Sequence, residues 1–163
     1  HKLHTKKKII VLSGPGNNGG DGLIISQFLK KLNRNVNLYC PKYNFYKGDA
    51  KKAYKKNKLV KNSFTKLEIY KNSIIVDCLF GIGLNRKING IYKKIIKKVN
   101  KSKQYIISID IPSGINGNTG EKMGDAIKAN LTYALHAKKV GHTIGMGKKY
   151  SGKVKVVDIR IRK

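Results

Sequence analysis

The amino-acid sequence predicts an α/β protein with a three-layer α/β/α, Rossmann-like fold and a mainly parallel central sheet. Two observations support this prediction. Short runs rich in Ile and Val alternate with longer Lys-rich stretches whose apolar residues recur at helical spacing. Several of the short runs are apolar throughout, which is typical of strands covered on both faces of a parallel sheet. The chain of 163 residues shows no repeat and no linker, so we expect one domain spanning residues 1–163.

The expected elements follow one another in β-α-β order. Strands are expected at residues 8–14, 36–40, 73–81, 105–112, 129–137 and 153–161. Amphipathic helices are expected at residues 21–34, 48–58 and 91–100. Residues 58–70 fit either a short strand or a loop, and a glycine-rich connection joins the last two strands.

The charge balance is strongly basic. Lys and Arg total 36 while Asp and Glu total 8, which gives a formal net charge of +28. Such a charge attracts polyanions, including nucleic acid. The excess is mainly Lys on segments that resemble solvated helix faces, without the interleaved aromatic residues that stack on bases. We therefore favour a solvated surface, of the kind AT-rich coding produces, over nucleic-acid binding.

Cysteine usage and hydropathy indicate the compartment. Cys40 and Cys78 are far apart and have neither CxxC nor metal-ligand spacing, which favours a reduced, intracellular location, cytoplasmic or organellar. The first residues, HKLHTKKK, lack the apolar region of a secretory signal. No apolar run approaches the roughly 20 residues of a membrane span, so we expect no membrane association.

Three expected strands end in glycine-rich loops, with the sequences SGPGNNGGDG, DCLFGIGLNRK and DIPSGINGNTG. In open α/β sheets, ligands bind beyond the carboxyl ends of the strands. Asp21, Asp77 and Asp110 all lie at these ends, although the whole chain has only eight acidic residues. This concentration of carboxylates predicts the functional site.

The first loop has the glycine spacing of a nucleotide site. Gly14, Gly16 and Gly19 fit G-x-G-x-x-G, and the amides of such a loop can hold phosphate at a helix N-terminus. An NAD-dependent oxidoreductase also needs an acid at the end of the second strand to bind ribose, and VNLYCPKYN contains none. A Walker loop is excluded because no Gly-Lys is followed by Ser or Thr. The loop therefore favours nucleotide binding for a chemistry other than hydride transfer, and the alternatives are an NAD-dependent oxidoreductase or a plain strand-to-helix turn.

Two further roles are suggested by residue type. Asn18, Asp77 and Ser113 offer oxygen ligands with a single carboxylate, which suits a hard cation of low charge better than zinc or iron. Asp110 precedes Ile-Pro, so we expect an extended backbone there and a carboxylate that points off the strand end, as a general acid/base would. The alternative for Asp110 is a cap on nearby turn amides.

The strings GPGNNGGDG, VDCLFGIGL and DIPSGINGNTG, followed by KAN-T and a later Lys-Gly, are similar to the motifs of the YjeF N-terminal domain family. The similarity extends from about Lys8 to the final strand. Catalytic members of this family are NAD(P)HX epimerases, which interconvert the R and S forms of nicotinamide cofactors hydrated at C6. An ATP- or ADP-dependent dehydratase then acts on the S form. The resemblance also implies a homodimer and one K⁺ per subunit.

The resemblance assigns roles to individual residues. The substrate-binding residues it implies are Asn17, Asn18, Gly19, Gly20, Asp21, Gly81, Ile82, Gly83, Leu84, Asn85, Arg86, Lys87 and Asp110. The K⁺ ligands it implies are Asn18, Asp77 and Ser113. Asp110 would be the catalytic acid/base, and Lys138 would pair with it or contact phosphate.

The chain departs from the family pattern in a few places. It starts almost at the first strand, where family members usually carry a helical segment that contributes to the dimer. Ile82, Asn130 and Leu135 stand where Thr, Asp and Phe are common. Some relatives are non-catalytic scaffolds of mRNA decapping that bind RNA or partner proteins, but such scaffolds tend to lose motif residues. Because the motif residues are intact, we favour the enzyme over the scaffold.

Overall fold

The computed structural model describes residues 7–159, and its centre is a seven-stranded sheet in the order β3-β2-β1-β4-β5-β6-β7. All six pairs of neighbouring strands are parallel. The strands are β1 (Ile9–Ser13), β2 (Val36–Tyr39), β3 (Lys61–Asn62), β4 (Ile74–Cys78), β5 (Tyr105–Ile109), β6 (Leu131–Leu135) and β7 (Lys153–Val157). The predicted parallel sheet is confirmed.

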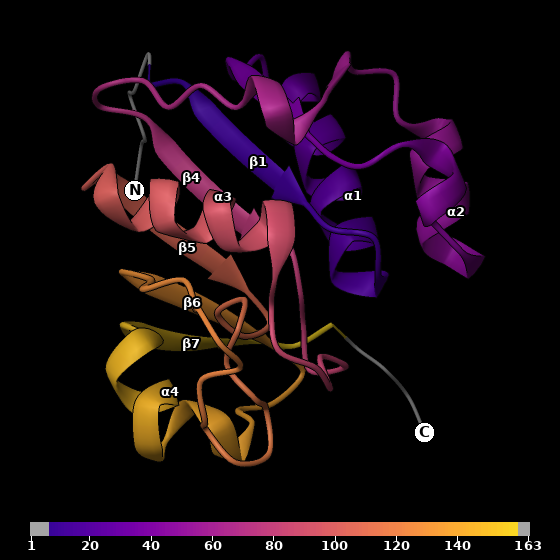
Figure 1. Cartoon of the computed structure of the whole chain (residues 1–163). Helices are drawn as coiled ribbons and strands as arrows, with labels where there is room; N and C mark the ends of the chain where they lie inside the picture. Colours follow the sequence, from indigo (N-terminus) through magenta and orange to yellow (C-terminus); the bar gives the residue numbers. More distant parts are fainter. Residues whose placement is uncertain (1–6, 160–163) are drawn as a thin grey trace.

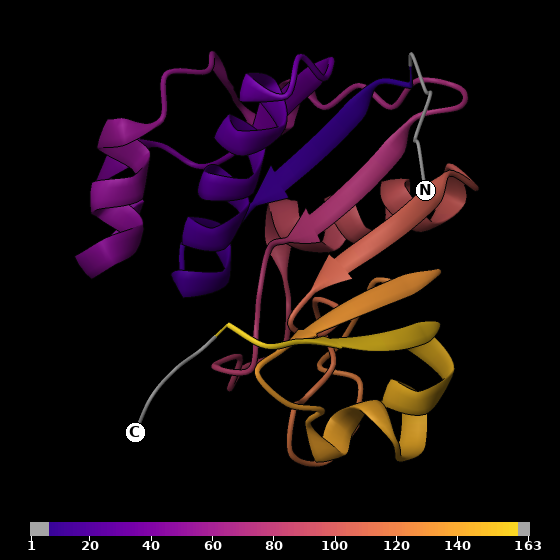
Figure 2. The ribbon, with the colours of Figure 1, turned by 180° about the vertical axis from the view of Figure 1, so that it is seen from behind.

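Helices cover both faces of the sheet. They are α1 (Asn17–Lys31), α2 (Gly48–Lys56), α3 (Gly90–Lys101) and the short α4 (Gly145–Tyr150), with 3-10 turns at η1 (Tyr43–Phe45), η2 (Phe64–Lys66) and η3 (Val140–His142). Figure 1 looks at the face covered by α3, and Figure 2, from behind, at the face covered by α1 and α2. The three-layer α/β/α arrangement follows. Within residues 7–159, no helix is long and apolar enough to cross a membrane.

The central strands are apolar throughout because each face of the sheet has its own core. Ile10 of β1 and Ile75 of β4 pack in the cluster that contains Ile96 of α3. Val11 and Val76, one residue further along the same strands, pack in the cluster beneath α1 and α2. Successive side chains point to opposite faces of a strand, so a strand buried on both faces shows no polar alternation.

The glycines at the start of α1 allow close packing against the ends of β1 and β4. A Cβ on Gly14 would lie 1.7 Å from the carbonyl oxygen of Leu79, and a Cβ on Gly19 would lie 1.7 Å from that of Gly14. The helix begins at Asn17, and the expected start at residue 21 was therefore wrong. Glycine has low helix propensity, but tertiary packing overrides that preference here.

The remaining differences concern element ends and short elements. The expected strand at 105–112 ends at Ile109, and the one at 153–161 ends at Val157, with residues 160 and 161 outside the described part of the chain. The ambiguous segment 58–70 contains both β3 and η2. The glycine-rich connection before β7 contains η3 and α4, which no periodic pattern of useful length indicated.

Candidate active site

The three glycine-rich loops follow β1, β4 and β5, which are neighbours in the sheet. The strand order reverses between β1 and β4, and open α/β sheets bind ligands at such a switch point. A cleft of about 470 Å³ lies there. Its lining residues are Pro15, Gly16, Asn17, Asn18, Asp21, Leu79, Phe80, Gly81, Ile82, Gly83, Leu84, Asn85, Arg86 and Asp110. Most of the predicted substrate-binding residues therefore gather around one cleft.

Five predicted site residues do not line this cleft. Gly19 and Gly20 are buried in the first turns of α1, where they permit its close packing. Lys87 is exposed at the end of the second loop. Asp77 lies buried below the cleft near the end of β4, and Ser113 lies buried shortly after the end of β5.

Asp110 lies immediately beyond β5 in a left-handed backbone conformation, with φ of 68°. The expected extended conformation was wrong. A proline restricts the backbone of the residue directly before it, which is Ile111 here and not Asp110. The Asp110 N–H donates to the carbonyl of Tyr133 at 2.8 Å. The carboxylate lies near the second loop, since a Cβ on Gly81 would be 3.4 Å from Asp110 Oδ2. Its left-handed backbone thus places a largely buried carboxylate at the cleft.

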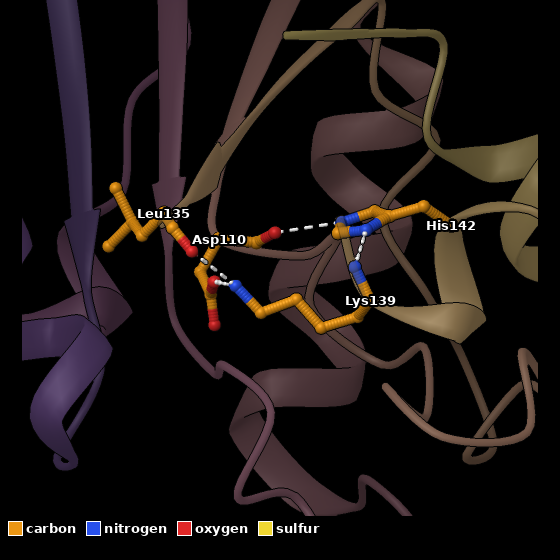
Figure 3. A network of polar contacts seen from close by, with 4 residues as sticks. All are labelled: Asp110, Leu135, Lys139 and His142. Carbon is orange, nitrogen blue, oxygen red and sulfur yellow. Dashed lines mark hydrogen bonds and ion pairs between the residues drawn. The ribbon is translucent and has the colours of Figure 1, made fainter. Parts of the chain in front are cut away.

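Lys139 forms an ion pair with Asp110 (Figure 3). Its Nζ contacts Asp110 Oδ1 and also donates to the carbonyl of Leu135 at 2.7 Å. The two side chains are only 17% and 12% exposed, so bulk water screens the pair weakly. The expected partner, Lys138, is exposed, and that assignment was wrong by one residue. Sequence alone could not choose between two consecutive lysines, because the turn at η3 decides which one faces Asp110.

A second carboxylate faces the same region. Asp21, on α1, is half-buried, and burial is the main cause that raises its pKa. The charge of Asp110 raises the pKa of Asp21 further, because a like charge nearby disfavours the ionised form. The cleft therefore contains one carboxylate whose charge Lys139 balances and a second that takes up a proton more readily than an exposed aspartate.

Below the cleft, the carboxylate of Asp77 is completely buried. It accepts hydrogen bonds from the Ser108 hydroxyl at 2.8 Å and from the backbone N–H groups of Ser113 at 2.9 Å and Leu79 at 3.2 Å, and the Ser113 hydroxyl also donates to it. Burial raises the pKa of Asp77, and these hydrogen bonds oppose the rise. Across residues 7–159, no lysine or arginine pairs with this carboxylate. A buried carboxylate without a cationic neighbour suits a site that takes up a cation.

Asn18 is buried, yet neither its amide oxygen nor its amide nitrogen has a hydrogen-bond partner among the described residues. Leaving such a group unpaired costs about 1–3 kcal/mol, so its partner is expected to be a ligand. The side chain lies against the second loop, because a Cβ on Gly81 would be 3.1 Å from Asn18 Cβ. Among residues 7–159, no three His, Cys, Asp or Glu side chains are grouped so that they could hold a metal ion.

The cleft is suited both to an anionic ligand and to proton transfer. The N-terminus of α1 presents unpaired backbone N–H groups to it, and Arg86 adds a positive charge. Asp110, with Lys139, supplies a carboxylate within a partly buried environment. Phosphate binding and acid/base chemistry can therefore act on the same molecule.

Comparison with known proteins agrees with this reading. The family model described as YjeF-related protein N-terminus matches residues 1–141. The chain is 34% identical to the NAD(P)H-hydrate epimerase of Limosilactobacillus reuteri (strain ATCC 55730 / SD2112), over 93% of this chain and 73% of the relative. It is 36% identical to the NAD(P)H-hydrate epimerase of Elusimicrobium minutum, over 98% and 76%.

Two further relatives extend the comparison. The bifunctional NAD(P)H-hydrate repair enzyme Nnr of Dictyoglomus turgidum is 40% identical over 83% of this chain, which matches 27% of that longer protein. The crystal structure of the yeast protein ynu0 superposes with a TM-score of 0.72 at 25% identity, covering 96% of this chain and 67% of the yeast chain. The chain therefore belongs to the family of the YjeF-related protein N-terminus.

Proposed function

We propose that this protein is an NAD(P)H-hydrate epimerase that interconverts the R and S forms of NADHX and NADPHX. The observation that carries this proposal is the Asp110–Lys139 pair, placed at a cleft that the predicted nucleotide-binding loops line. The names of the relatives that match most of the chain describe the same activity.

The proposed substrate fits the cleft by charge. We place its diphosphate at the N-terminus of α1, because the backbone N–H groups there attract anions, and Arg86 also lines the cleft. We place its hydrated nicotinamide ring against Asp110. Asn18 and Asp110 both lie against Gly81, so the free amide nitrogen of Asn18 can donate to the carboxamide or hydroxyl of the ring.

The reaction then needs one proton to move from the Asp110–Lys139 pair to the substrate and to return to the pair. The Asp110–Lys139 pair gives a proton to the C6 hydroxyl, the C6–O bond breaks, and water leaves. The lone pair of the ring nitrogen forms a C=N bond to C6, which leaves a planar cation. Water adds to the opposite face, the nitrogen regains its lone pair, and the added water returns a proton to the pair. The ammonium of Lys139 stabilises the carboxylate while it carries a negative charge.

We further propose that Asn18, Asp77 and Ser113 hold one K⁺ per subunit. The buried, unpaired amide oxygen of Asn18 and the buried carboxylate of Asp77 fit a cation that prefers oxygen ligands. The three residues belong to the three glycine-rich loops, so a bound cation would supply positive charge and hold the loops together. The chain's own residues carry the proton transfer described above.

We also propose an intracellular homodimer, cytoplasmic or organellar, that works alongside an NAD(P)HX dehydratase. The two cysteines are buried free thiols, which suits a reducing compartment. The bifunctional names of some relatives support coupling between epimerisation and the next repair step.

Conversion of (R)-NADHX to the S form, followed by chromatography, tests the proposed function. The wild-type protein should catalyse it, and Asp110→Asn should lower kcat by about 10²–10⁴-fold, as for loss of a general acid/base. Asp49→Asn, which removes an exposed carboxylate on α2, serves as the matched control and should leave kcat unchanged. A wild-type protein that binds RNA and leaves NADHX unconverted would favour the scaffold instead.

A further inference from the structure

We propose that His142 is a positioning residue: as the neutral Nε2–H tautomer, it holds the backbones of Asp110 and Lys139 in the one arrangement that keeps their side chains paired. This inference rests on the proposed function, because it concerns the two residues assigned to proton transfer. His142 does not line the cleft, so it would act only through Asp110 and Lys139.

Hydrogen bonding determines the tautomer. The backbone N–H of Lys139 donates to His142 Nδ1 at 2.9 Å, so Nδ1 must carry the lone pair. The backbone carbonyl of Asp110 lies 2.8 Å from His142 Nε2, and a carbonyl can only accept, so Nε2 must carry the proton. Both ring nitrogens are thus used, and only the neutral Nε2–H form satisfies both partners. Figure 3 shows the ring between the two backbones.

The environment of His142 keeps the ring neutral. The residue is only 4% exposed. Burial is the main cause that lowers its pKa; the hydrogen bond to the Asp110 carbonyl and the charge of Asp110 oppose this shift, and the neighbouring ammonium of Lys139 adds to it. A protonated ring would direct an N–H at the backbone N–H of Lys139, so protonation would also break the bond to that residue.

Asp110 needs such support because its left-handed backbone is strained for a residue other than glycine. Its N–H is held by Tyr133, its carboxylate by Lys139 and its carbonyl by His142. His142 is the one partner that also bonds the backbone of Lys139. Removing the imidazole would therefore remove one backbone contact from each member of the ion pair at once.

The turn that carries His142 is itself fixed. The His142 N–H donates to the carbonyl of Lys139 at 3.0 Å, which closes η3. The N–H of Gly141 donates to the carbonyl of Gly117 at 2.7 Å, and a Cβ on Gly141 would lie 2.3 Å from the carbonyl oxygen of Asn116. The turn thus packs directly on the loop that follows Asp110, and the ring has a rigid base from which to position it.

Three substitutions at His142 separate positioning from packing. His142→Gln can place an amide N–H where Nε2 lies, whereas His142→Asn reaches only to the position of Nδ1. His142→Leu removes both hydrogen bonds. We expect His142→Leu to lower kcat for epimerisation by about 10–100-fold with KM changed less than about threefold, as when a supporting contact shifts a reacting group. His142→Gln should recover most of kcat, and His142→Asn should recover less.

The matched control is His136→Asn, which removes an exposed imidazole from the turn after β6 and tolerates the left-handed backbone of that position. It should leave kcat unchanged. Thermal melting of each variant checks folding. If His142→Leu does not fold, the comparison of His142→Gln with His142→Asn decides, and equal kcat values for these two would overturn the proposal.

The ¹⁵N chemical shifts of the His142 ring in the wild-type protein provide a measurement independent of catalysis. Near neutral pH, Nε2 should show the shift of a protonated nitrogen and Nδ1 that of an unprotonated one. An Nδ1–H or doubly protonated ring would overturn the inference even if the enzyme is active. An inactive wild type whose ring has the expected tautomer would instead count against the proposed function.

Discussion

Asp110 combines two features, a left-handed backbone and a largely buried carboxylate that is paired with a lysine. Left-handed backbone costs an L-residue about 1–2 kcal/mol, and Asp and Asn are the side chains, after glycine, that adopt it most readily. Strain of this size persists where several contacts over-determine the geometry, as they do here, and it is concentrated at functional sites.

The position of Asp110 at the cleft could be predicted because Asp110 is one of few carboxylates and lies at a strand end. Its backbone conformation and its partner could not. Both depend on η3, a three-residue turn that has no periodic pattern and whose position is set by contacts with residues far away in the sequence. The role proposed for His142 was missed for the same reason, because a lone histidine in a glycine-rich segment carries no signal of its contacts.

At the residue scale, Asp21→Asn should stabilise the protein at neutral pH. Burial and the charge of Asp110 raise the folded-state pKa of Asp21, so the folded protein binds this proton more tightly than the unfolded chain. The stabilisation from that proton is complete below the unfolded pKa and is lost as pH rises through the folded one. An ionised Asp21 therefore opposes folding at pH 7.5.

Denaturant unfolding at pH 4 and at pH 7.5 measures this effect. The variant should gain roughly 0.5–2 kcal/mol over the wild type at pH 7.5, as is common for replaced functional residues, and clearly less at pH 4. A variant no more stable than the wild type at pH 7.5 would show that the ionised carboxylate of Asp21 does not oppose folding.

At the scale of elements, the first glycine-rich loop shows what sequence patterns can and cannot predict. Buried strands such as β1 and β4 can be predicted from sequence because both of their faces are apolar, and the loops at their ends can be predicted from their glycines. The start of α1 could not be predicted, because Gly19 and Gly20 favour a loop unless their packing against the strand ends is known. Short elements such as β3 and α4 contain too few residues to show a period.

This packing predicts that alanine substitutions at two glycines of the same loop will change the free energy of unfolding by very different amounts. Gly19→Ala would place a Cβ 1.7 Å from the carbonyl oxygen of Gly14, and only backbone movement could relieve that clash. The free energy of unfolding should fall by about 3 kcal/mol or more. Gly16→Ala is the matched control, because a Cβ there meets nothing within 4 Å and its φ of −93° suits any residue. Guanidinium unfolding of both variants measures the difference, and equal losses would contradict the packing argument.

At the scale of the whole molecule, the strand order brings the three loops together. The sequence predicts that strand ends gather at one edge of a parallel sheet, but it does not specify which strands are neighbours. The order β3-β2-β1-β4-β5-β6-β7 places β1, β4 and β5 side by side, and Asn18, Asp77 and Ser113 follow or end these strands. A cation at these residues would connect three segments that are distant in sequence.

The proposed K⁺ site predicts that stability depends on which salt is present. The net charge of +28 makes any salt stabilising through screening of self-repulsion, equally for NaCl and KCl. A bound K⁺ adds a further stabilisation, about 2.7 kcal/mol at a concentration of 100 times its Kd. Melting temperatures at matched ionic strength should therefore be higher in KCl than in NaCl. Asn18→Ala should abolish that difference and Asn17→Ala should keep it, whereas equal melting of the wild type in both salts would contradict the site.

The most direct test of the central claim, that Asp110 drives loss and return of the C6 hydroxyl, is epimerisation of (R)-NADHX in H₂¹⁸O, followed by mass spectrometry of the first (S)-NADHX formed. The wild-type protein should produce the S form with one ¹⁸O, faster than buffer alone, and Asp110→Asn should produce it about 10²–10⁴-fold more slowly than the wild type. An S form that retains its original oxygen, or an Asp110→Asn protein as fast as the wild type, would contradict the account.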